Sequence, residues 1–268
     1  MKVLLVNNRY KESTELMAQN IAERLSKKNI IVEIDDGSNE VKNIDLIIVL
    51  GGDGTILRAA RQYAYKNIPI LGVNMGTIGF LSSVEVNEFY HYLGLIIQGD
   101  YSLDERMMLE ASIYQNNQLI QESICLNEVV VKSKNHQMIS LNLEIGGDKQ
   151  AIYRGDGLLV ATPTGSTAYS LSCGGPIVDP DLDSFIITPL APHLITQRPL
   201  VLSPAKDIVI SNFTTKHILI SLDGQINLDI EDNCMVKIIK SEHRILLVDL
   251  KKHPFFSRLD VKLGRNGV

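Results

Sequence analysis

A short run of glycines around one aspartate, Gly51-Gly52-Asp53-Gly54-Thr55, holds the residues best suited to chemistry. It follows Leu46 to Leu50, an unbroken apolar run of strand length. Glycine lets the main chain take positive φ and lie directly against a ligand. A glycine turn between a buried strand and a helix aims several main-chain N–H groups and a helix dipole at one point, and such points bind phosphate. The predicted phosphate-site residues are Gly51, Gly52, Gly54 and Thr55.

Asp53 is the unexpected member of this turn, because a carboxylate repels phosphate unless it has another task. It could hold Mg²⁺, or it could accept the proton of a hydroxyl that attacks a phosphoryl group. An ordinary tight turn is the alternative, and it is the better explanation of an Asp-Gly pair alone. Here the turn joins a buried strand to a helical pattern that starts at Ile56, with Thr55 as the predicted N-cap, and this context favours function.

Two common nucleotide-binding motifs are missing from the sequence. No G-x-x-x-x-G-K-[ST] occurs, which excludes a P-loop. G-x-G-x-x-G does not occur at the first predicted strand, where a dinucleotide-binding dehydrogenase carries it.

A second dense region runs from Tyr153 to Val178 and combines hydroxyls, glycines and a tyrosine. Leu158 to Ala161 predicts a strand, 162–167 a hydroxyl-rich turn, and Ala168 to Ser172 the start of a helix. Hydroxyls, N–H groups and an aromatic ring in one turn suit an adenine, a ribose or a phosphate. The alternative is the capped start of a helix that happens to contain many hydroxyls. This alternative would account for any four of these residues, but it accounts less well for the whole block.

The pair Asn127-Glu128 is a smaller signal of the same kind. An amide beside a carboxylate offers a donor and acceptors suited to vicinal sugar hydroxyls. A surface loop is the alternative, and for this pair on its own it is the commoner case.

The elements that must position the glycine turn alternate between strand and helix. Strands are predicted at 3–6, 30–34, 46–50 and 68–73, and helices at 13–27, 55–65 and 86–98. This alternation is typical of βαβ units and a parallel sheet, whose ligands bind at the carboxyl ends of the strands. The glycine turn lies at one such end and residues 74–80 at another, which predicts a crevice. Phe80 could be a lid or stacking residue there, with a core aromatic as the alternative.

The pattern changes after about Tyr101. Short strands are predicted at 109–114, 124–131, 139–145, 157–161, 199–202, 208–210, 218–222, 235–239 and 245–248. Many short strands separated by turn residues predict an all-β domain, either a sandwich or a barrel. Residues 254–263 have mixed helical character and can fold back onto the first domain.

Composition limits what the chain can bind. With 268 residues it is long enough for two domains, and a net charge of −5 without a basic stripe argues against nucleic acid as the main partner. Its 3 cysteines contain no C-x-x-C and predict neither a disulfide framework nor a zinc site. No signal peptide is recognisable and no apolar run approaches about 18 residues, so a cytoplasmic protein with no membrane partner is expected.

Taken together and in this order, these pieces resemble the NAD kinase family, the polyphosphate/ATP-NAD kinases. The glycine-aspartate turn alone is weak evidence, because lipid kinases and phosphofructokinases use similar turns. The block at 155–172 is far more specific, and the resemblance covers nearly the whole chain. The motifs are G-G-D-G-T at 51–55, G-T-I-G-F at 76–80, L-N-E at 126–128, the block at 155–172, G-G-P-I at 174–177, P-L-A-P-H at 189–193, R-P-L-V at 198–201 and D-G-Q at 223–225.

The resemblance implies a fold and an activity. It implies a Rossmann-like parallel α/β domain at 1–100, a β-sandwich domain at 101–252 that binds NAD, and a C-terminal segment at 253–268 that packs back on the α/β domain. NAD would lie in the cleft between the domains, and the subunits would form a homodimer or homotetramer. The implied reaction transfers a phosphoryl group from ATP, or from polyphosphate, to the 2′-hydroxyl of the adenosine ribose of NAD, with Mg²⁺ or Mn²⁺, and gives NADP.

The family pattern also implies roles for single residues. Asp53 would face the 2′-hydroxyl as general base, with Gly54 beside the ligand. Asn127 and Glu128 would hold the nicotinamide ribose, and Asp156 would meet the carboxamide. The remaining NAD-binding residues implied are Phe80, Arg154, Thr167, Ala168, Tyr169, Ser170, Leu171, Ser172, Ala191 and Gln225, with His136 as a further ligand position.

Two other functions fit parts of this pattern. A non-catalytic dinucleotide sensor needs no carboxylate aimed at a hydroxyl, so Asp53 argues against it. A lipid kinase requires an exposed apolar slot for an acyl chain, and the block at 155–172 offers hydroxyls instead. The metal ligands are not assigned: Asp53 is one candidate, and donor phosphates can supply most of the coordination.

Overall fold

The structure is a computed structural model, and it describes residues 1–8, 12–35, 37, 42–76, 79–135, 137–150, 152–211, 217–230, 233–250 and 255–263. The chain forms two compact units. The first, which we call the α/β unit, comprises Met1–Arg106 and His243–Val268, and the second, the sandwich unit, comprises Met107–Glu242. The domain limits expected from the sequence, at 100/101 and 252/253, remain a prediction.

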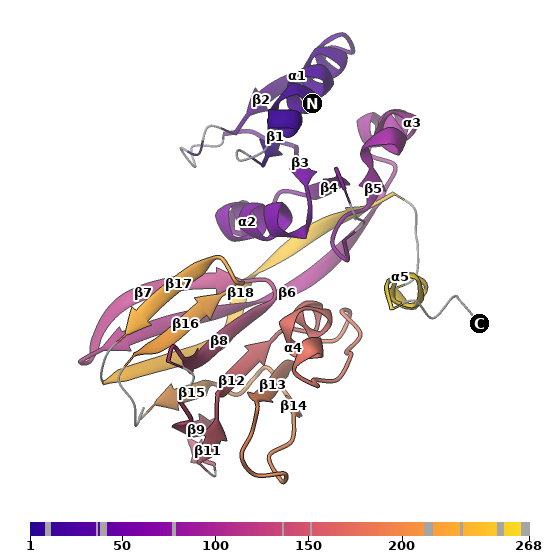
Figure 1. Cartoon of the computed structure of the whole chain (residues 1–268). Coiled ribbons are helices and arrows are strands. Elements are labelled where there is room, and N and C mark those ends of the chain that lie inside the picture. Colours follow the sequence, from indigo (N-terminus) through magenta and orange to yellow (C-terminus); the bar gives the residue numbers. More distant parts are fainter. Residues whose placement is uncertain are drawn as a thin grey trace. The chain divides into compact units, whose positions relative to one another are not determined.

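The α/β unit contains a parallel sheet (Figure 1). Its sheet order is β4-β3-β1-β2, so the chain leaves β1 toward one edge and then returns to build β3 and β4 on the other side. Such a reversal creates a crevice at the carboxyl ends of the two central strands, here β1 and β3. The elements are β1 (Lys2–Asn7), α1 (Glu12–Ser26), β2 (Ile31–Ile34), β3 (Leu46–Gly51), α2 (Asp53–Tyr63), η1 (Ala64–Lys66), β4 (Ile70–Asn74), β5 (Val84–Glu85), α3 (Val86–Gln98) and α5 (Phe255–Lys262).

Helices cover both faces of this sheet. Every residue of β3 is buried, as an uninterrupted apolar strand in a parallel sheet should be. One face packs against α1 and α3, whose inward residues include Ile21 and Phe89. The other face carries α2, which lies so close to β4 that a Cβ on Gly72 would stand 2.5 Å from Ile56 Cδ1. The predicted βαβ organisation is confirmed.

The sandwich unit consists of antiparallel strands in two sheets that share one apolar core. One sheet has the order β14-β13-β12-β8-β16-β17, and the other contains β9, β10, β11 and β15 with β6, β7 and β18. Strands β6 and β18 are continuous with the α/β unit, because the unit limits fall within them. The elements are β6 (Ser102–Gln115), β7 (Gln118–Cys125), β8 (Glu128–Ser133), β9 (Ile139–Ile145), β10 (Asp148–Lys149), β11 (Tyr153–Gly155), β12 (Gly157–Ala161), η2 (Thr164–Thr167), α4 (Tyr169–Ser172), β13 (Phe185–Leu190), β14 (Leu200–Leu202), β15 (Ile208–Ser211), β16 (Ile218–Leu222), β17 (Ile226–Ile230) and β18 (Cys234–Asp249).

Several strand predictions in the sandwich unit differ from the structure. The strands expected at 235–239 and 245–248 belong to one continuous strand, β18, and no strand was expected at β10, β11 or β17. The single strand expected at 124–131 is two strands, because the chain turns at Leu126 and Asn127 between β7 and β8. No strand was expected at β13, which is buried throughout and lies between β12 and β14. Pro189 lies within β13, and a proline argues against a central strand because it cannot donate to the ladder.

Candidate functional site

Asp53 occupies the first turn of α2, directly after β3 ends. Gly52 is the N-cap, with φ −108° and ψ −172°, so the prediction of Thr55 as N-cap is wrong. Gly52 has an extended backbone conformation and the helix begins at the next residue, Asp53. Thr55 therefore lies inside the first turn. The side chain of Thr55 is buried against Gly51, where an added Cβ would stand 2.3 Å from Thr55 Oγ1.

The carboxylate of Asp53 is held by the loop that follows β4. The main-chain N–H of Phe80 donates to Oδ2 at 2.8 Å, and that of Leu81 donates to Oδ1 at 3.2 Å. Gly79 makes this approach possible, because a Cβ there would stand 1.7 Å from Asp53 Oδ1. The two glycine-bearing loops that the sequence predicts at neighbouring strand ends therefore meet at Asp53.

The other residues of the predicted phosphate site differ in exposure. Gly52 and Gly54 are exposed, whereas Gly51 and Thr55 are buried. Phe80 is half-buried, and the ammonium of Lys262 in α5 lies 5.6 Å from the centroid of its ring. Whether these residues contact a ligand remains a prediction.

The Asn127-Glu128 pair lies where the chain turns from β7 into β8. The carboxylate of Asp223, in the turn between β16 and β17, accepts hydrogen bonds from the main-chain N–H groups of the turn: Leu126 at 2.9 Å, Asn127 at 2.8 Å and Glu128 at 3.1 Å. On its other side the turn is fixed by Thr162, whose hydroxyl donates to the carbonyl of Leu126 at 2.6 Å.

Glu128 is a buried carboxyl beside a second buried carboxyl. Burial raises the pKa of Glu128 to about 8, the charge of Asp223 adds to the rise, and a hydrogen bond from the main chain of Tyr169 opposes it. Within the described part of the chain, Oε2 of Glu128 has no hydrogen-bond partner. An acceptor and potential donor is therefore available at this position.

Three of the hydroxyls in the block at 155–172, those of Thr162, Ser166 and Ser170, have partners outside their own helical turns in the sandwich unit. The Thr162 hydroxyl also accepts from the main-chain N–H of Gly165, at 3.0 Å. Ser166 Oγ accepts from the N–H of Val178 at 3.1 Å, and Ser170 Oγ lies 2.9 Å from the Thr188 hydroxyl. Thr162 thus connects the segment to the β7–β8 turn, and Ser170 connects it to β13. Ser170 is also one of the NAD-binding residues that the resemblance implies, and that role remains a prediction.

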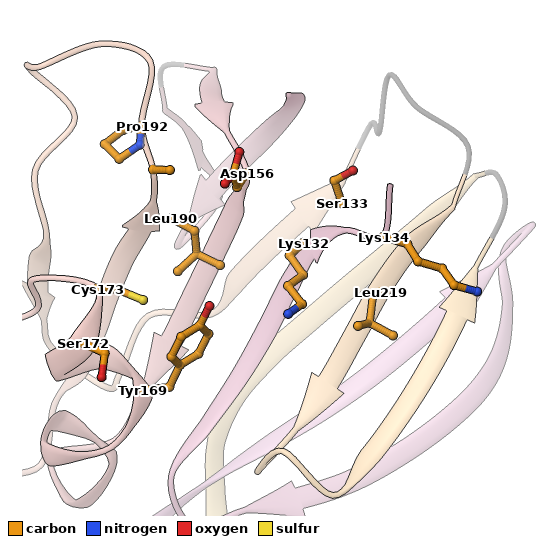
Figure 2. A pocket seen from close by; sticks show the side chains of 11 residues that line it. Lys132, Ser133, Lys134, Asp156, Tyr169, Ser172, Cys173, Leu190, Pro192 and Leu219 are labelled. Carbon is orange, nitrogen blue, oxygen red and sulfur yellow. The ribbon is translucent and has the colours of Figure 1, made fainter. Parts of the chain in front are cut away.

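A pocket of about 700 Å³ opens in the sandwich unit. Figure 2 shows Tyr169, Cys173 and Leu190 along one wall, with Lys132 and Leu219 along the other. Of the residues expected to bind NAD, Asp156, Tyr169, Ser172 and Ala191 line this pocket. Those expected in the same unit that are not among its lining residues are Asn127, Glu128, Arg154, Thr167, Ala168, Ser170, Leu171 and Gln225.

Several of the remaining residues can still be placed. Arg154 is exposed on β11, and Gln225 is exposed directly before β17. Thr167, Ala168 and Leu171 are half-buried in and around η2 and α4. His136 lies outside the described residues.

Lys132 and Cys173 line the pocket and were missed by the sequence analysis. Strand alternation places Glu128, Val130 and Lys132 on one face of β8, and this spacing was the signal available for Lys132. Burial raises the pKa of the Cys173 thiol, a hydrogen bond with Tyr169 lowers it, and Glu128 and Lys132 act on it in opposite directions. The other lining residues that were missed are Ser133, Lys134, Leu190, Pro192 and Leu219.

The described residues were also searched for metal sites and membrane spans. No group of three or more His, Cys, Asp and Glu side chains within them could hold a metal ion. In the same part of the chain, no helix is both long and apolar enough to cross a membrane.

The fold and these features define the class of protein. A parallel α/β sheet with a glycine-aspartate turn at a strand end shares one chain with an antiparallel sandwich that carries a polar pocket. Residues 39–101 match the ATP-NAD kinase N-terminal domain, and residues 126–250 match the ATP-NAD kinase C-terminal domain.

Individual proteins agree with this class. The chain is 40% identical over 222 residues to an NAD kinase of Natranaerobius thermophilus, an alignment covering 82% of this chain and 77% of the relative. A crystal structure of an NAD kinase from Archaeoglobus fulgidus in complex with ATP superposes with a TM-score of 0.81 at 30% identity and covers 98% of each chain. Yeast NADH kinase complexed with NADH shares the fold, with a TM-score of 0.86 at 24% identity over 100% of this chain and 88% of the yeast chain. The chain belongs to the NAD kinase family.

Proposed function

We propose that this chain transfers the terminal phosphoryl group of ATP to the 2′-hydroxyl of the adenosine ribose of NAD and forms NADP, with Asp53 as general base. Membership of the NAD kinase family supports the reaction. The observation that carries the role of Asp53 is its carboxylate, which two main-chain N–H groups hold at the carboxyl end of β3. A carboxylate has about four lone-pair positions, and these two bonds leave acceptor capacity for a hydroxyl.

The chemistry of phosphoryl transfer defines what Asp53 must do. A ribose hydroxyl is a far weaker acid than a carboxylic acid, so a carboxylate does not remove its proton in the ground state. Phosphoryl transfer passes through a loose transition state in most analyses, and the attacking oxygen loses its proton late. Asp53 would orient the 2′-oxygen and take its proton as the new P–O bond forms.

The sandwich unit would bind the remainder of NAD. The amide of Asn127 and the carboxyl of Glu128 suit the vicinal hydroxyls of a ribose. Asp156, Tyr169, Ser172 and Ala191 already line one pocket, in which Asp156 would meet the carboxamide and the other three would contact NAD. Lys132 lines the same pocket, so its ammonium would be an additional positive charge beside the ligand.

Among the described residues, none form a complete site for a divalent metal without help from the substrates. The described residues hold no cluster of three metal-ligating side chains, so Asp53 could supply only part of a metal's coordination. Mg²⁺ or Mn²⁺ would therefore be held mainly by the donor phosphates, as Mg²⁺ commonly is. The cytoplasmic location, the homodimer or homotetramer and the use of polyphosphate remain predictions.

The substitution Asp53→Asn tests the general base. We expect the turnover number for NADP formation to fall by about 10²–10⁴-fold, because that is the usual contribution of a general base. NAD affinity, measured by calorimetry, should stay within about threefold, since the amide keeps the shape of the side chain. Asp100→Asn, at an exposed position of the same unit, is the matched control.

Two outcomes would contradict the proposal in different ways. Unchanged turnover in purified Asp53→Asn would remove the base but keep the reaction. A wild-type chain that binds NAD and forms no NADP with either ATP or polyphosphate would instead be a dinucleotide sensor.

A further inference from the structure

Asp223 is a buried aspartate that holds the Leu126–Glu128 turn, far away in the sequence. It and Gly224 form the tip of the β16–β17 hairpin, with φ of 50° and 66°. Two successive residues with positive φ are the mark of the tight hairpin turn that Asp-Gly favours. This turn directs the carboxylate, only 5% exposed, at the Leu126–Glu128 turn, and the main-chain N–H of Asp223 donates back to the carbonyl of Glu128 at 2.9 Å.

The Leu126–Glu128 turn depends on an acceptor at this point. Its three successive N–H groups all donate to Asp223. A buried donor that loses its partner costs free energy, and charge-assisted bonds of this kind are the stronger ones. Two carbonyl groups of the turn are bound by Thr162 instead. The Thr162 hydroxyl donates to the carbonyl of Leu126, and the main-chain N–H of Thr162 donates to the carbonyl of Asn127 at 2.9 Å. Asp223 is thus the residue that accepts the hydrogen bonds of the N–H groups in this turn.

We propose that Asp223 is a positioning residue for dinucleotide binding, which fixes the direction of Asn127 and Glu128. This inference rests on the proposed function for its ligand. The contacts that carry it are those of Asp223 with the turn, and they belong to the sandwich unit alone.

The charge of Asp223 has a chemical consequence for Glu128. The titratable groups that face Glu128 are Asp223 from the hairpin, and Tyr169 and Cys173 from the α4 segment, while Lys132 lies further along the same face of β8. Burial and the Asp223 charge raise the pKa of Glu128 to about 8, so the carboxyl is mostly protonated at neutral pH. A protonated carboxyl donates one hydrogen bond and accepts another, which matches a vicinal diol.

The test uses the full-length chain with Asp223→Asn. Asparagine keeps one acceptor oxygen and the size of the side chain but removes the charge. Asp207→Asn is the matched control, because it removes one negative charge from the same unit at an exposed ion pair with Lys237. For each protein, KM for NAD and kcat are measured between about pH 6 and pH 9.5 at saturating ATP. The pH dependence of the thermal midpoint is recorded without substrate, alongside Glu128→Gln.

We expect Asp223→Asn to raise KM for NAD about tenfold and to change kcat by less than about threefold, because the loss concerns binding. The inflection assigned to Glu128, near pH 8 in the wild type, should move to lower pH by about one unit, because a nearby negative charge has been removed. In Glu128→Gln the inflection should vanish, and Asp207→Asn should resemble the wild type.

A lowered thermal midpoint with an unmoved inflection would overturn the proposal, since a merely structural residue would behave that way. An unchanged KM would also overturn it. If Asp223→Asn does not fold, Asp223→Ser retains an acceptor oxygen without charge and is measured in its place. If the wild type forms no NADP, the proposed function fails, and the substrate-free titration still decides whether Asp223 controls Glu128.

Discussion

Two aspartates, Asp53 and Asp223, both accept main-chain N–H groups, yet their surroundings suit them to different tasks. Asp53 is half-buried and accepts two such bonds, so its carboxylate keeps capacity for a ligand. Asp223 is only 5% exposed and accepts three, which makes it an anchor for another turn. Residue type alone does not separate a candidate base from an anchor, whereas exposure and the number of accepted bonds do.

Glu128→Gln should change how stability depends on pH. Burial, helped by the charge of Asp223, raises the pKa of Glu128 from its ordinary value of 4.5 to about 8. The folded state therefore favours the protonated form, and the associated stability is fully present below about pH 4.5 and is lost as pH rises through about 8. The shift corresponds to at most about 5 kcal/mol. Relative to the wild type, Glu128→Gln should be more stable at high pH than at low pH.

Urea unfolding at low, neutral and high pH measures this effect. Glu122→Gln, at an exposed carboxyl on β7, is the control and should track the wild type at every pH. Parallel pH curves for Glu128→Gln and the wild type would mean that Glu128 ionises normally in the folded protein.

At the scale of elements, the loop after β4 and the start of α2 act together. The loop supplies N–H groups at Phe80 and Leu81, and α2 supplies the carboxylate that accepts them. The loop and the helix can approach this closely because residue 79 is a glycine, and a side chain there would collide with Asp53. In the sandwich unit, the hairpin turn of β16 and β17 acts on the β7–β8 turn in a comparable way.

Gly79→Ala should disable the enzyme without unfolding it. The new Cβ would stand 1.7 Å from Asp53 Oδ1, so the carboxylate must move. We expect kcat to fall by about tenfold or more, because a displacement of about 1 Å can cost about a hundredfold. Gly76→Ala in the same loop is the matched control, since its Cβ would meet nothing within 4 Å. Equal activity of the two variants in the NADP assay would show that Asp53 does not depend on this approach.

At the scale of the whole molecule, the α/β unit is built from two separate parts of the chain. Residues 1–106 form most of it, and residues from 243 onward complete it. Leu247 pairs with Ile70 of β4, and Val248 and Leu250 belong to the apolar core of that unit. The unit therefore reaches its final core only after the sandwich unit has been synthesised.

Leu250→Ala tests this dependence. Leu250 is 8% exposed in the core of the α/β unit, and large-to-small substitutions at such sites cost about 2–5 kcal/mol. We expect a loss of about 2–3 kcal/mol in the free energy of unfolding by urea, given the residual exposure. Leu263→Ala, at an exposed position of the same C-terminal region, should change stability by less than about 0.5 kcal/mol. Equal stability of the two variants would mean that the returning segment contributes little.

Local patterns in the sequence were sufficient for much of the fold. The unbroken apolar run that became β3 reports burial on both faces, and the helical spacing of α1 and α3 reports one buried face each. The G-G-D-G-T turn predicted a carboxylate among glycines at a strand end, and the short strands after about residue 101 predicted an antiparallel β domain. These features depend on residues that are close together in the chain, so the spacing of apolar residues and glycines along the sequence is enough to predict them.

Only the tertiary structure decided which distant groups meet. The partners of Asp53 are 27 and 28 residues away, and those of Asp223 are 95 to 97 residues away. The inclusion of β13 despite Pro189 follows from its pairing with β12 and β14, and the Thr162 hydroxyl meets the carbonyl of Leu126, 36 residues away. Periodicity states that a side chain is buried, but the partner that satisfies its polar atoms is set by strand order and register in three dimensions.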